Sequence, residues 1–450
     1  MARQTLLLIC PPVLYATTWW ANRIANKPHI ASLAGYVRDL ADVRVLELDT
    51  SAGDQGDSWD RLAEAVTDSV GLVGISCWTS LHYPGAVATA ERVRHMAPHV
   101  PIAVGGHHPT AAPDDFNDTT CDWLVRGDGE HALRDMCTRW PSRPPRMTII
   151  EGGVFRQSNP DDIDWANYCE WNEHDRAIWA GMSRGCPFKC RYCVEPQRGP
   201  AYSGYTVNDA LAITENLVRT RKPRVIAFSD PLFGVNRQWT ESFLDGVLER
   251  DLPVMFWAET RADLMTPALL DRFKRCNFML DFGLDTASEA MVARMEKAGN
   301  PQLYLARSRE VLEHANRIGL AHGIYIVFNF PGETPQTMRE TQDFIDGLAV
   351  SGPTSGWLSC QTFFILPGTQ AFTQMEENAR TYGTQIRHPG WWRERGDHHA
   401  LATDVLPSAT WTGREDELRS FIAWNHDVNA RWSARYPSRV QRFRHAFYVA

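Results

Sequence analysis

The chain has 450 residues, a net charge of −8 and a hydrophobic content of 44%. This length predicts two or three domains, and the excess of acidic residues gives no reason to expect nucleic acid or a membrane surface as a partner. No stretch approaches the roughly 20 apolar residues of a membrane span. The ten cysteines are mostly scattered, which is typical of reduced thiols in a cytoplasmic protein.

The first 140 residues alternate predicted strands with predicted helices. Apolar runs predict strands at 5–10, 43–48, 72–77, 101–106 and 123–127. Helical spacing of apolar residues predicts helices at 29–40, 59–70, 84–96 and 130–140. This alternation predicts an α/β domain with a parallel, doubly wound, Rossmann-like sheet, in which ligands bind beyond the carboxyl ends of the strands.

Residues 141–175 are rich in proline, aspartate and asparagine, and we interpret them as a linker. A second series follows, with strands predicted at 178–182, 224–229, 254–258, 278–283, 323–329 and 357–365 and helices between them. These six units are fewer than the eight of a closed barrel, so residues 176–369 are predicted to form an open, partial (β/α)6 barrel. Residues 370–450 are polar and aromatic and are predicted to be mostly helical.

The most informative motif lies directly after the first strand of this second series. Cys186, Cys190 and Cys193 have the spacing C-x3-C-x2-C on one short loop, with glycine, proline and two basic residues among them. A structural zinc site and an iron–sulfur cube each use four ligands. Three thiolates therefore predict a cluster with one open iron; three buried free cysteines, or a zinc site completed by a distant residue, are the alternatives.

This loop resembles the cluster motif of the radical S-adenosylmethionine (SAM) enzymes, and the residues around it are similar to the branch with an N-terminal cobalamin-binding-type domain. Further matches follow in the same order along about 360 residues, and their joint order is more specific than any one of them. They are Gly105-Gly-His-His-Pro-Thr110, Val125-Arg-Gly-Asp-Gly-Glu130, Phe228-Ser-Asp-Pro-Leu-Phe233, Arg261-Ala-Asp263, Gly283-Leu-Asp-Thr286, Phe330-Pro-Gly-Glu-Thr334 and Leu366-Pro-Gly-Thr369.

The resemblance implies that the three cysteines hold a [4Fe–4S] cluster whose fourth iron binds SAM. One electron from a flavodoxin- or ferredoxin-type donor then yields a 5′-deoxyadenosyl radical. The resemblance also places Tyr192 near the adenine of SAM. It assigns the rest of SAM to residues at strand ends: Ser229, Asp230, Glu259, Arg261 and Asp285. Arginine suits a carboxylate, and acids suit an ammonium or ribose hydroxyls. The alternatives are a helix cap for Asp285 and a surface ion pair for Arg261.

The resemblance also raises cobalamin as a cofactor of the first domain, near Thr79, Gly105 and Gly106. No Asp-x-His-x-x-Gly occurs in the first 140 residues, and His107 replaces the usual proline. Bulky residues also crowd the strand-end loops: Tyr15, Trp19, Trp20, Trp78, His82 and Tyr83. These departures argue against a bound corrin, although aromatic rings could also stack on one. We do not favour a metal pair at His107 and His108, because adjacent residues of an extended segment point in opposite directions.

Three functions are open for the chain, and we favour the first of them, deoxygenation, with methyl transfer as the alternative. It is similar to the radical SAM diol-dehydratase of aminoglycoside biosynthesis, which implies loss of a hydroxyl from a small aminosugar. The acid and base would come from the barrel or tail, with these candidates: Asp281, His322, Glu333, His398 and His399. The second function is cobalamin-dependent C-methylation of a small natural product. The third is a non-enzymatic iron–sulfur sensor, which leaves the SAM motifs without a purpose.

Overall fold

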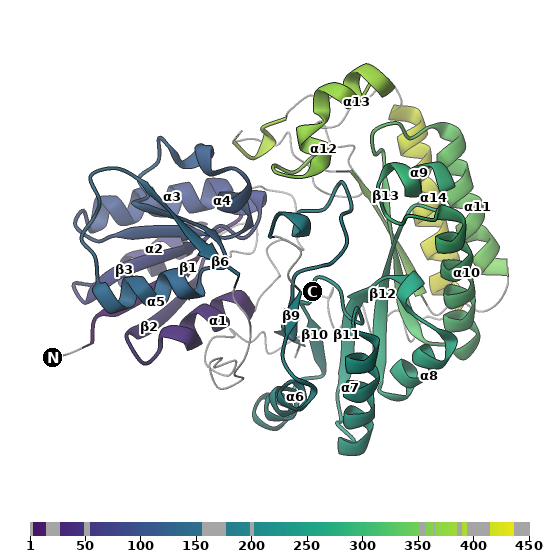
Figure 1. The fold of residues 1–450 in the computed structure, drawn as a ribbon, viewed down its shortest axis with the longest axis horizontal. Coiled ribbons are helices and arrows are strands. Elements are labelled where there is room, and N and C mark those ends of the chain that lie inside the picture. The colour runs from purple at the N-terminus through teal and green to yellow at the C-terminus, as the bar shows by residue number, and fades with distance from the viewer. Residues whose placement is uncertain are drawn as a thin grey trace. The chain divides into compact units, whose positions relative to one another are not determined.

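The computed structural model describes residues 3–14, 28–48, 55–154, 177–198, 202–350, 356–363, 365–384, 389–393 and 415–435. The chain divides into two compact units, which are considered separately below (Figure 1). Unit 1 spans Met1–Glu170 with the short segments Leu366–Gly368 and Gly390–His399, and unit 2 takes the remainder. None of the helices within the described ranges has the length and apolar character needed to cross a membrane.

Unit 1 is a doubly wound domain, as predicted. Its six strands are parallel and have the order β2-β1-β3-β4-β5-β6. Because side chains alternate along a strand, Leu7 and Ile9 enter one core cluster while Leu6 and Leu8 enter the other, on the opposite face. The elements are β1 (Thr5–Cys10), α1 (Pro28–Val37), β2 (Asp42–Glu47), α2 (Gln55–Ala65), β3 (Val70–Ser76), α3 (Tyr83–Met96), β4 (Ile102–Gly105), α4 (His107–Ala111), β5 (Trp123–Gly127), α5 (Glu130–Arg139) and β6 (Thr148–Gly153).

The sixth strand corrects the interpretation of residues 141–175 as a linker. Strand β6 pairs with β5 in parallel, with Trp123 opposite Thr148. It lies at the edge of the sheet, and most of its side chains are exposed, including Ile149 at 45%. A short edge strand needs little apolar sequence, so its composition resembles that of a linker.

Unit 2 is a partial barrel with six parallel strands in chain order, β7-β10-β11-β12-β13-β14, as predicted. Phenylalanines of β10 and β12 pack against those of α7 and α8, so the helices cover one face of the sheet. The strands are β7 (Ala177–Ala180), β10 (Val225–Phe228), β11 (Met255–Thr260), β12 (Phe278–Asp285), β13 (Ala321–Phe328) and β14 (Gly356–Thr362). The helices of this series are α6 (Val207–Arg221), α7 (Arg237–Arg250), α8 (Pro267–Arg275), α9 (Glu289–Arg294), α10 (Pro301–Ile318) and α11 (Pro335–Val350).

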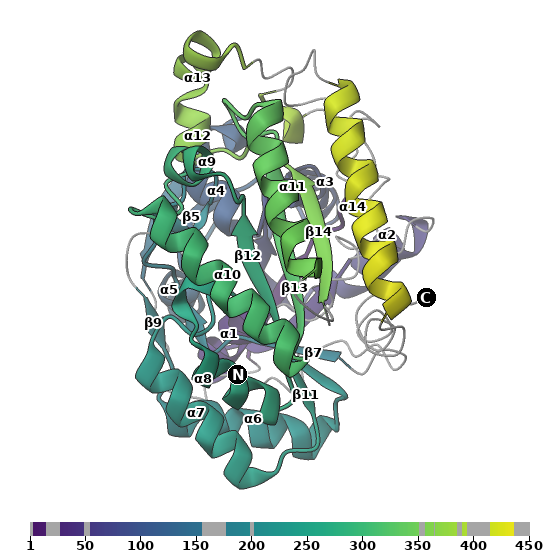
Figure 2. The same cartoon turned by 90° about the vertical axis from the view of Figure 1, so that its right-hand side faces the viewer.

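Three further helices follow the barrel: α12 (Gln370–Thr373), α13 (Met375–Tyr382) and α14 (Glu415–Arg435). Figure 2 shows α14 beside α11 and the edge strand β14. Asn429 of α14 bonds to both backbone groups of Leu358 in β14, accepting from its N–H at 2.8 Å and donating to its carbonyl at 2.7 Å. The helix therefore anchors the edge of the barrel through a side-chain amide.

We expect Asn429→Ala to lower the stability of unit 2 by about 1–3 kcal/mol, because Leu358 loses two hydrogen bonds in a partly buried place. Thermal unfolding and hydrogen exchange at the Leu358 amide would measure the loss. The control is Ser420→Ala on the exposed side of the same helix. Equal protection of Leu358 in all three proteins would contradict this anchoring.

Candidate functional site

The three cysteines lie together on the loop that follows β7. Cys190 is buried, Cys186 and Cys193 are half-buried, and all three are free thiols. The loop turns tightly, since the N–H of Cys193 donates to the carbonyl of Cys190 at 3.1 Å. Burial raises the pKa of Cys193 to about 12, so positive irons would be needed to hold three thiolates here.

No three side chains of histidine, cysteine, aspartate or glutamate converge on a single metal ion within the described part of the chain. A zinc site places four ligands on one ion, whereas a cluster receives one thiolate at each of its irons.

The carboxyl end of β10 holds the backbone that leads into the cysteine loop. Asp230 accepts a hydrogen bond from the N–H of Met182 at 3.0 Å and another from the hydroxyl of Ser183. Burial raises the pKa of this carboxyl to about 6. Ser229 bonds through its N–H to the carbonyl of Ala180 at 2.8 Å. Both residues, expected to bind SAM, thus contact the start of the loop.

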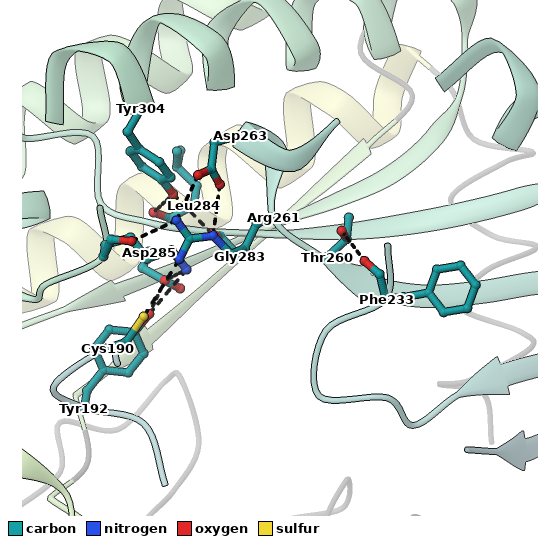
Figure 3. Close-up of polar contacts among 11 residues, drawn as sticks. Cys190, Tyr192, Phe233, Thr260, Arg261, Asp263, Gly283, Leu284, Asp285 and Tyr304 are labelled. Carbon is teal, nitrogen blue, oxygen red and sulfur yellow. Dashed lines mark hydrogen bonds and ion pairs between the residues drawn. The ribbon is translucent and has the colours of Figure 1, made fainter. Parts of the chain in front are cut away.

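The carboxyl end of β11 reaches the middle of the loop through Arg261 (Figure 3). Its guanidinium forms a bidentate pair with Asp263 at 2.9 and 3.0 Å, and it also donates to the carbonyl of Lys297 at 2.8 Å. The remaining nitrogen points to the sulfur of Cys190 at 3.9 Å. The same group stacks on the Phe188 ring of the loop, 3.9 Å from its centroid. Most donors of Arg261 are therefore used within the protein.

The end of β12 contacts the last turn of the loop. Asp285 has a left-handed backbone, with φ of 62°, and its Oδ2 accepts from the hydroxyl of Tyr192 and from the ammonium of Lys297. Its Oδ1 has no hydrogen-bond partner among the described residues. Burial, and next the charge of Asp285, raise the pKa of Tyr192 well above its usual value. The structure therefore unites Asp285 with Tyr192 and adds Lys297, which the sequence did not single out.

Glu259 lies on the sheet face opposite the helices. Its side chain is accessible to solvent. Desolvation by the surrounding protein is the larger cause that raises the pKa of Glu259 to about 7, and the negative charges of Asp281 and Asp285 add to it. Glu259 is opposite Asp281 in the register of β11 and β12. It can therefore give or accept a proton near neutral pH.

Below Glu259, the same sheet face is closed by aromatic side chains around Asp281. The buried carboxylate accepts from the indole of Trp257 at 2.9 Å, the indole of Trp357 at 3.2 Å and the hydroxyl of Tyr325 at 2.9 Å. Trp179 packs edge-on against Trp257, with centroids 5.2 Å apart. This set forms an aromatic floor, and burial raises the pKa of Asp281 to about 6.

The other candidate acids and bases are placed away from this face. His322 is buried beside Phe282, where burial lowers its pKa to about 4. Glu333 accepts from the N–H of Asn329 in the turn after β13. His398 and His399 lie outside the described residues.

In unit 1, the candidate cobalamin residues lie at the carboxyl edge of the sheet. The hydroxyl of Thr79 bonds to His82 at 2.9 Å. Gly105 and Gly106 are half-buried, and Gly106 has φ of 127°, with no room for a Cβ next to the carbonyl of Cys77. The accessible glycine backbone fits the approach of a polar ligand tail, whereas the Thr79 hydroxyl is already engaged.

The end of β3, at the switch point between β1 and β3, is occupied by side chains. His29 bonds to the hydroxyl of Ser76 at 2.9 Å and stacks on Trp78, with centroids 5.4 Å apart. A nucleotide tail entering here would have to displace this stack. The loop residues Tyr15, Trp19 and Trp20 lie outside the described residues.

The second of the two adjacent histidines is engaged within unit 1. His108 is buried, bonds to Ser80 at 2.9 Å and pairs with Asp115 at 3.2 Å. Asp115 also accepts from Trp392 and Arg393, and its pKa falls to about 2: burial opposes the fall, but the bonds from His108, Arg393 and Trp392 outweigh it. His108 thus belongs to a structural network of unit 1.

Two parts of the sequence match known families. Residues 181–345 match the radical SAM superfamily, and residues 25–136 match the family described as B12 binding domain. The chain is 21% identical over 350 residues to the anaerobic magnesium-protoporphyrin IX monomethyl ester cyclase of Rubrivivax gelatinosus, covering 69% of this chain and 60% of that protein. It is 24% identical over 310 residues to an uncharacterized methyltransferase of Synechocystis sp., covering 62% and 52%. The chain thus spans between half and three fifths of these relatives.

Two solved structures share the fold of the chain. One is the radical SAM methyltransferase TsrM from Kitasatospora setae with cobalamin and a [4Fe-4S] cluster, with a TM-score of 0.67 and 17% identity. The alignment covers 86% of this chain and 77% of the TsrM chain. The other is the cobalamin-dependent radical enzyme OxsB, with a TM-score of 0.63 and 16% identity, covering 85% and 62%. At these identities the likeness shows the fold alone.

The buried Asp281 generates a prediction on pH and stability. Its pKa of about 6 in the folded protein exceeds the roughly 3.9 of an unfolded aspartate. The folded state therefore binds its proton more tightly, and the free energy of unfolding should fall as the pH rises from about 4 to about 6. Asp281→Asn should remove this share of the decline while lowering stability by about 1–3 kcal/mol, because an amide replaces one acceptor.

Urea unfolding of unit 2, followed by tryptophan fluorescence between about pH 4.5 and 7.5, would measure the effect. Asp346→Asn is the control, since Asp346 forms an exposed ion pair with Arg431. If the free energy of unfolding of Asp281→Asn fell with pH as steeply as that of the wild type, Asp281 would not be the cause of the decline.

Proposed function

Because the chain is a radical SAM enzyme with an N-terminal domain of the B12-binding type, we propose that it cleaves SAM at the cysteine loop of unit 2. The radical formed takes a hydrogen atom from a small polar substrate. One observation carries this proposal: the ends of β10, β11 and β12 meet the same short loop, through Asp230, Arg261 and Asp285. The loop of three thiols thus lies where parallel α/β folds keep their chemistry.

The superfamily implies a [4Fe–4S] cluster and SAM. Cys186, Cys190 and Cys193 would hold the cluster, which supplies one electron for reductive cleavage of the sulfonium when loaded and reduced. A flavodoxin- or ferredoxin-type protein is the proposed donor. The residues of the chain bind and orient SAM around that electron transfer.

The contacts suggest separate tasks for the proposed SAM residues. Arg261 is engaged with Asp263, Lys297 and Cys190, so we assign it to holding the loop. Asp285 keeps its Oδ1 available for a ribose hydroxyl or the ammonium of SAM. Tyr192 would pack near the adenine. Ser229 and Asp230 would fix the entrance to the loop.

The substrate would lie on the sheet face of Glu259, above the aromatic floor. Ring faces suit the apolar faces of a sugar-like molecule, and carboxylates suit its hydroxyl or ammonium groups. Three carboxyl groups place negative charge near this face: those of Glu259, Asp281 and Asp285. The two cations in this region are already paired, Lys297 with Asp285 and Arg261 with Asp263. We therefore propose a hydroxylated and cationic small molecule as the substrate class.

For the substrate radical, methyl transfer from cobalamin is the fate that the relatives support best. The B12-binding match and the fold shared with two cobalamin enzymes support it. Thr79, Gly105 and Gly106 would hold the cofactor at the edge of unit 1. Cobalamin would supply the methyl group, and the chain would exclude water and orient the substrate.

Deoxygenation of an aminosugar is the second candidate, and two observations favour it. Glu259 offers a group of pKa about 7 that can protonate a departing hydroxyl, so that water leaves as the carbon–oxygen bond breaks and the hydroxyl on the radical carbon releases its proton to become a carbonyl. One further electron from the donor and one proton quench the remaining radical, and the product has lost one water. In addition, the stack of His29 on Trp78 occupies the strand edge that a nucleotide tail would enter.

Cys190→Ala should abolish the iron-dependent colour and all SAM cleavage, because one iron loses its thiolate. Anaerobic reconstitution, iron analysis and chromatography of 5′-deoxyadenosine would measure this. The matched control is Cys276→Ala, a buried thiol elsewhere in unit 2, which should retain both properties. Continued SAM cleavage by Cys190→Ala would overturn the proposed function.

The two fates differ in product mass and in the need for cobalamin. Methyl transfer predicts that reconstitution with hydroxocobalamin leaves a corrin absorption band on the protein and that the product gains CH2. Deoxygenation predicts turnover without a corrin and a product changed by loss of water. Mass spectrometry with candidate aminosugars would separate them, and a Glu259→Gln variant should slow only the deoxygenation.

A further inference from the structure

The connection between α9 and α10 spans residues 295–300, and its first three residues lie against the cysteine loop. The N–H of Arg191, next to Cys190, donates to the carbonyl of Met295 at 3.0 Å. The N–H of Lys297 donates back to Val292 at 3.0 Å, which fixes Lys297 at the end of α9. Lys297 is therefore held beside the loop by its own backbone.

Lys297 has two contacts with the residues that surround the loop. Its carbonyl accepts the Arg261 guanidinium at 2.8 Å, and Arg261 reaches the sulfur of Cys190. Its ammonium pairs with Asp285 and lies 3.4 Å from the Tyr192 hydroxyl. One residue thus joins the ends of β11 and β12 to two positions of the loop; Figure 3 shows Arg261, Cys190, Tyr192 and Asp285 together.

The pair of Lys297 and Asp285 is buried, with side-chain exposures of 6% and 8%. A buried ion pair adds little stability over apolar residues of the same size, because both charges lose their hydration. It fixes geometry, however, since breaking it leaves a charge without a partner in the interior. A role in precise placement explains this lysine better than a role in general stability.

We propose that Lys297 is a positioning residue of the radical site. It holds Tyr192 directly and Cys190 through Arg261, which would keep the loop in the shape that binds the cluster. This inference rests on the proposed SAM cleavage at the cysteine loop.

The chain contains a matched pair that joins the same two segments at the surface. Arg191 and Glu296 form an ion pair at 2.7 Å, with exposures of 30% and 41%. Exposed pairs of this kind contribute little, because water and salt screen them. Breaking this pair should therefore leave the loop in place, whereas breaking the buried pair should release it.

The test uses the full chain with Lys297→Met, Lys297→Gln and the control Glu296→Gln. In the iron-free proteins, the rate of Cys190 alkylation, read by mass spectrometry, reports the position of the loop. We expect Lys297→Met to raise this rate about tenfold or more, and Lys297→Gln to raise it less, since an amide can still donate to Asp285. Buried Cys276 should react equally in all variants, which separates loop release from unfolding.

A second readout follows in the reconstituted proteins. SAM titration of the reduced cluster, monitored by electron paramagnetic resonance, should show about tenfold weaker binding in Lys297→Met and wild-type binding in Glu296→Gln. If Lys297→Met fails to bind iron, the alkylation of Cys190 relative to Cys276 decides the question. Unchanged Cys190 reactivity in Lys297→Met would overturn the inference. A wild-type protein that binds iron but cleaves no SAM would instead contradict the proposed function.

Discussion

The chemistry proposed for this protein depends on holding three thiolates close together in a partly buried loop that has little regular structure of its own. Burial disfavours each negative charge, as the raised pKa of Cys193 shows, and neighbouring thiolates repel one another. The loop therefore takes its shape from outside. Asp230 holds its entrance, Arg261 its middle and Asp285 its last turn. Asp230 and Arg261 follow strands β10 and β11, and Asp285 is the last residue of β12.

The sheet face that carries Glu259 would let the proposed radical act selectively. Aromatic side chains surround Asp281 on this face, and Glu259, on the neighbouring strand, has a pKa of about 7. A reactive radical needs a shielded space in which only the substrate hydrogen is within reach. Arg261 is paired with Asp263 and Lys297 with Asp285, so neither cation neutralises Glu259 and Asp281. This face therefore remains acidic.

Much of the fold could be predicted from the sequence, because long periodic segments determine it. Strands β1 and β5 begin and end at the predicted residues, and the six parallel strands of unit 2 follow in chain order. Strand β6 could not be predicted, since an exposed edge strand has no apolar run. Among the site residues, the cysteines and Asp285 stood out through spacing and motif. Lys297 did not, because a lysine twelve positions after Asp285 looks like any surface lysine until the fold brings the two together.

The roles of the predicted residues depended on contacts that spacing does not contain. Arg261 was expected to bind a carboxylate of SAM, yet Asp263, only two residues away, takes two of its donors. Thr79 was expected to face a corrin, yet His82 takes its hydroxyl. In both cases the competing partner is two or three residues away along the chain, so the local turn of the backbone decides whether the two side chains meet.

The central claim is that the three-cysteine loop holds a cluster whose fourth iron binds SAM. Mössbauer spectroscopy of the anaerobically reconstituted protein, with and without SAM, tests this most directly. The account predicts that SAM changes the signal of one iron and leaves the other three as they were. Four irons that do not respond to SAM, or the absence of a cluster, would contradict it.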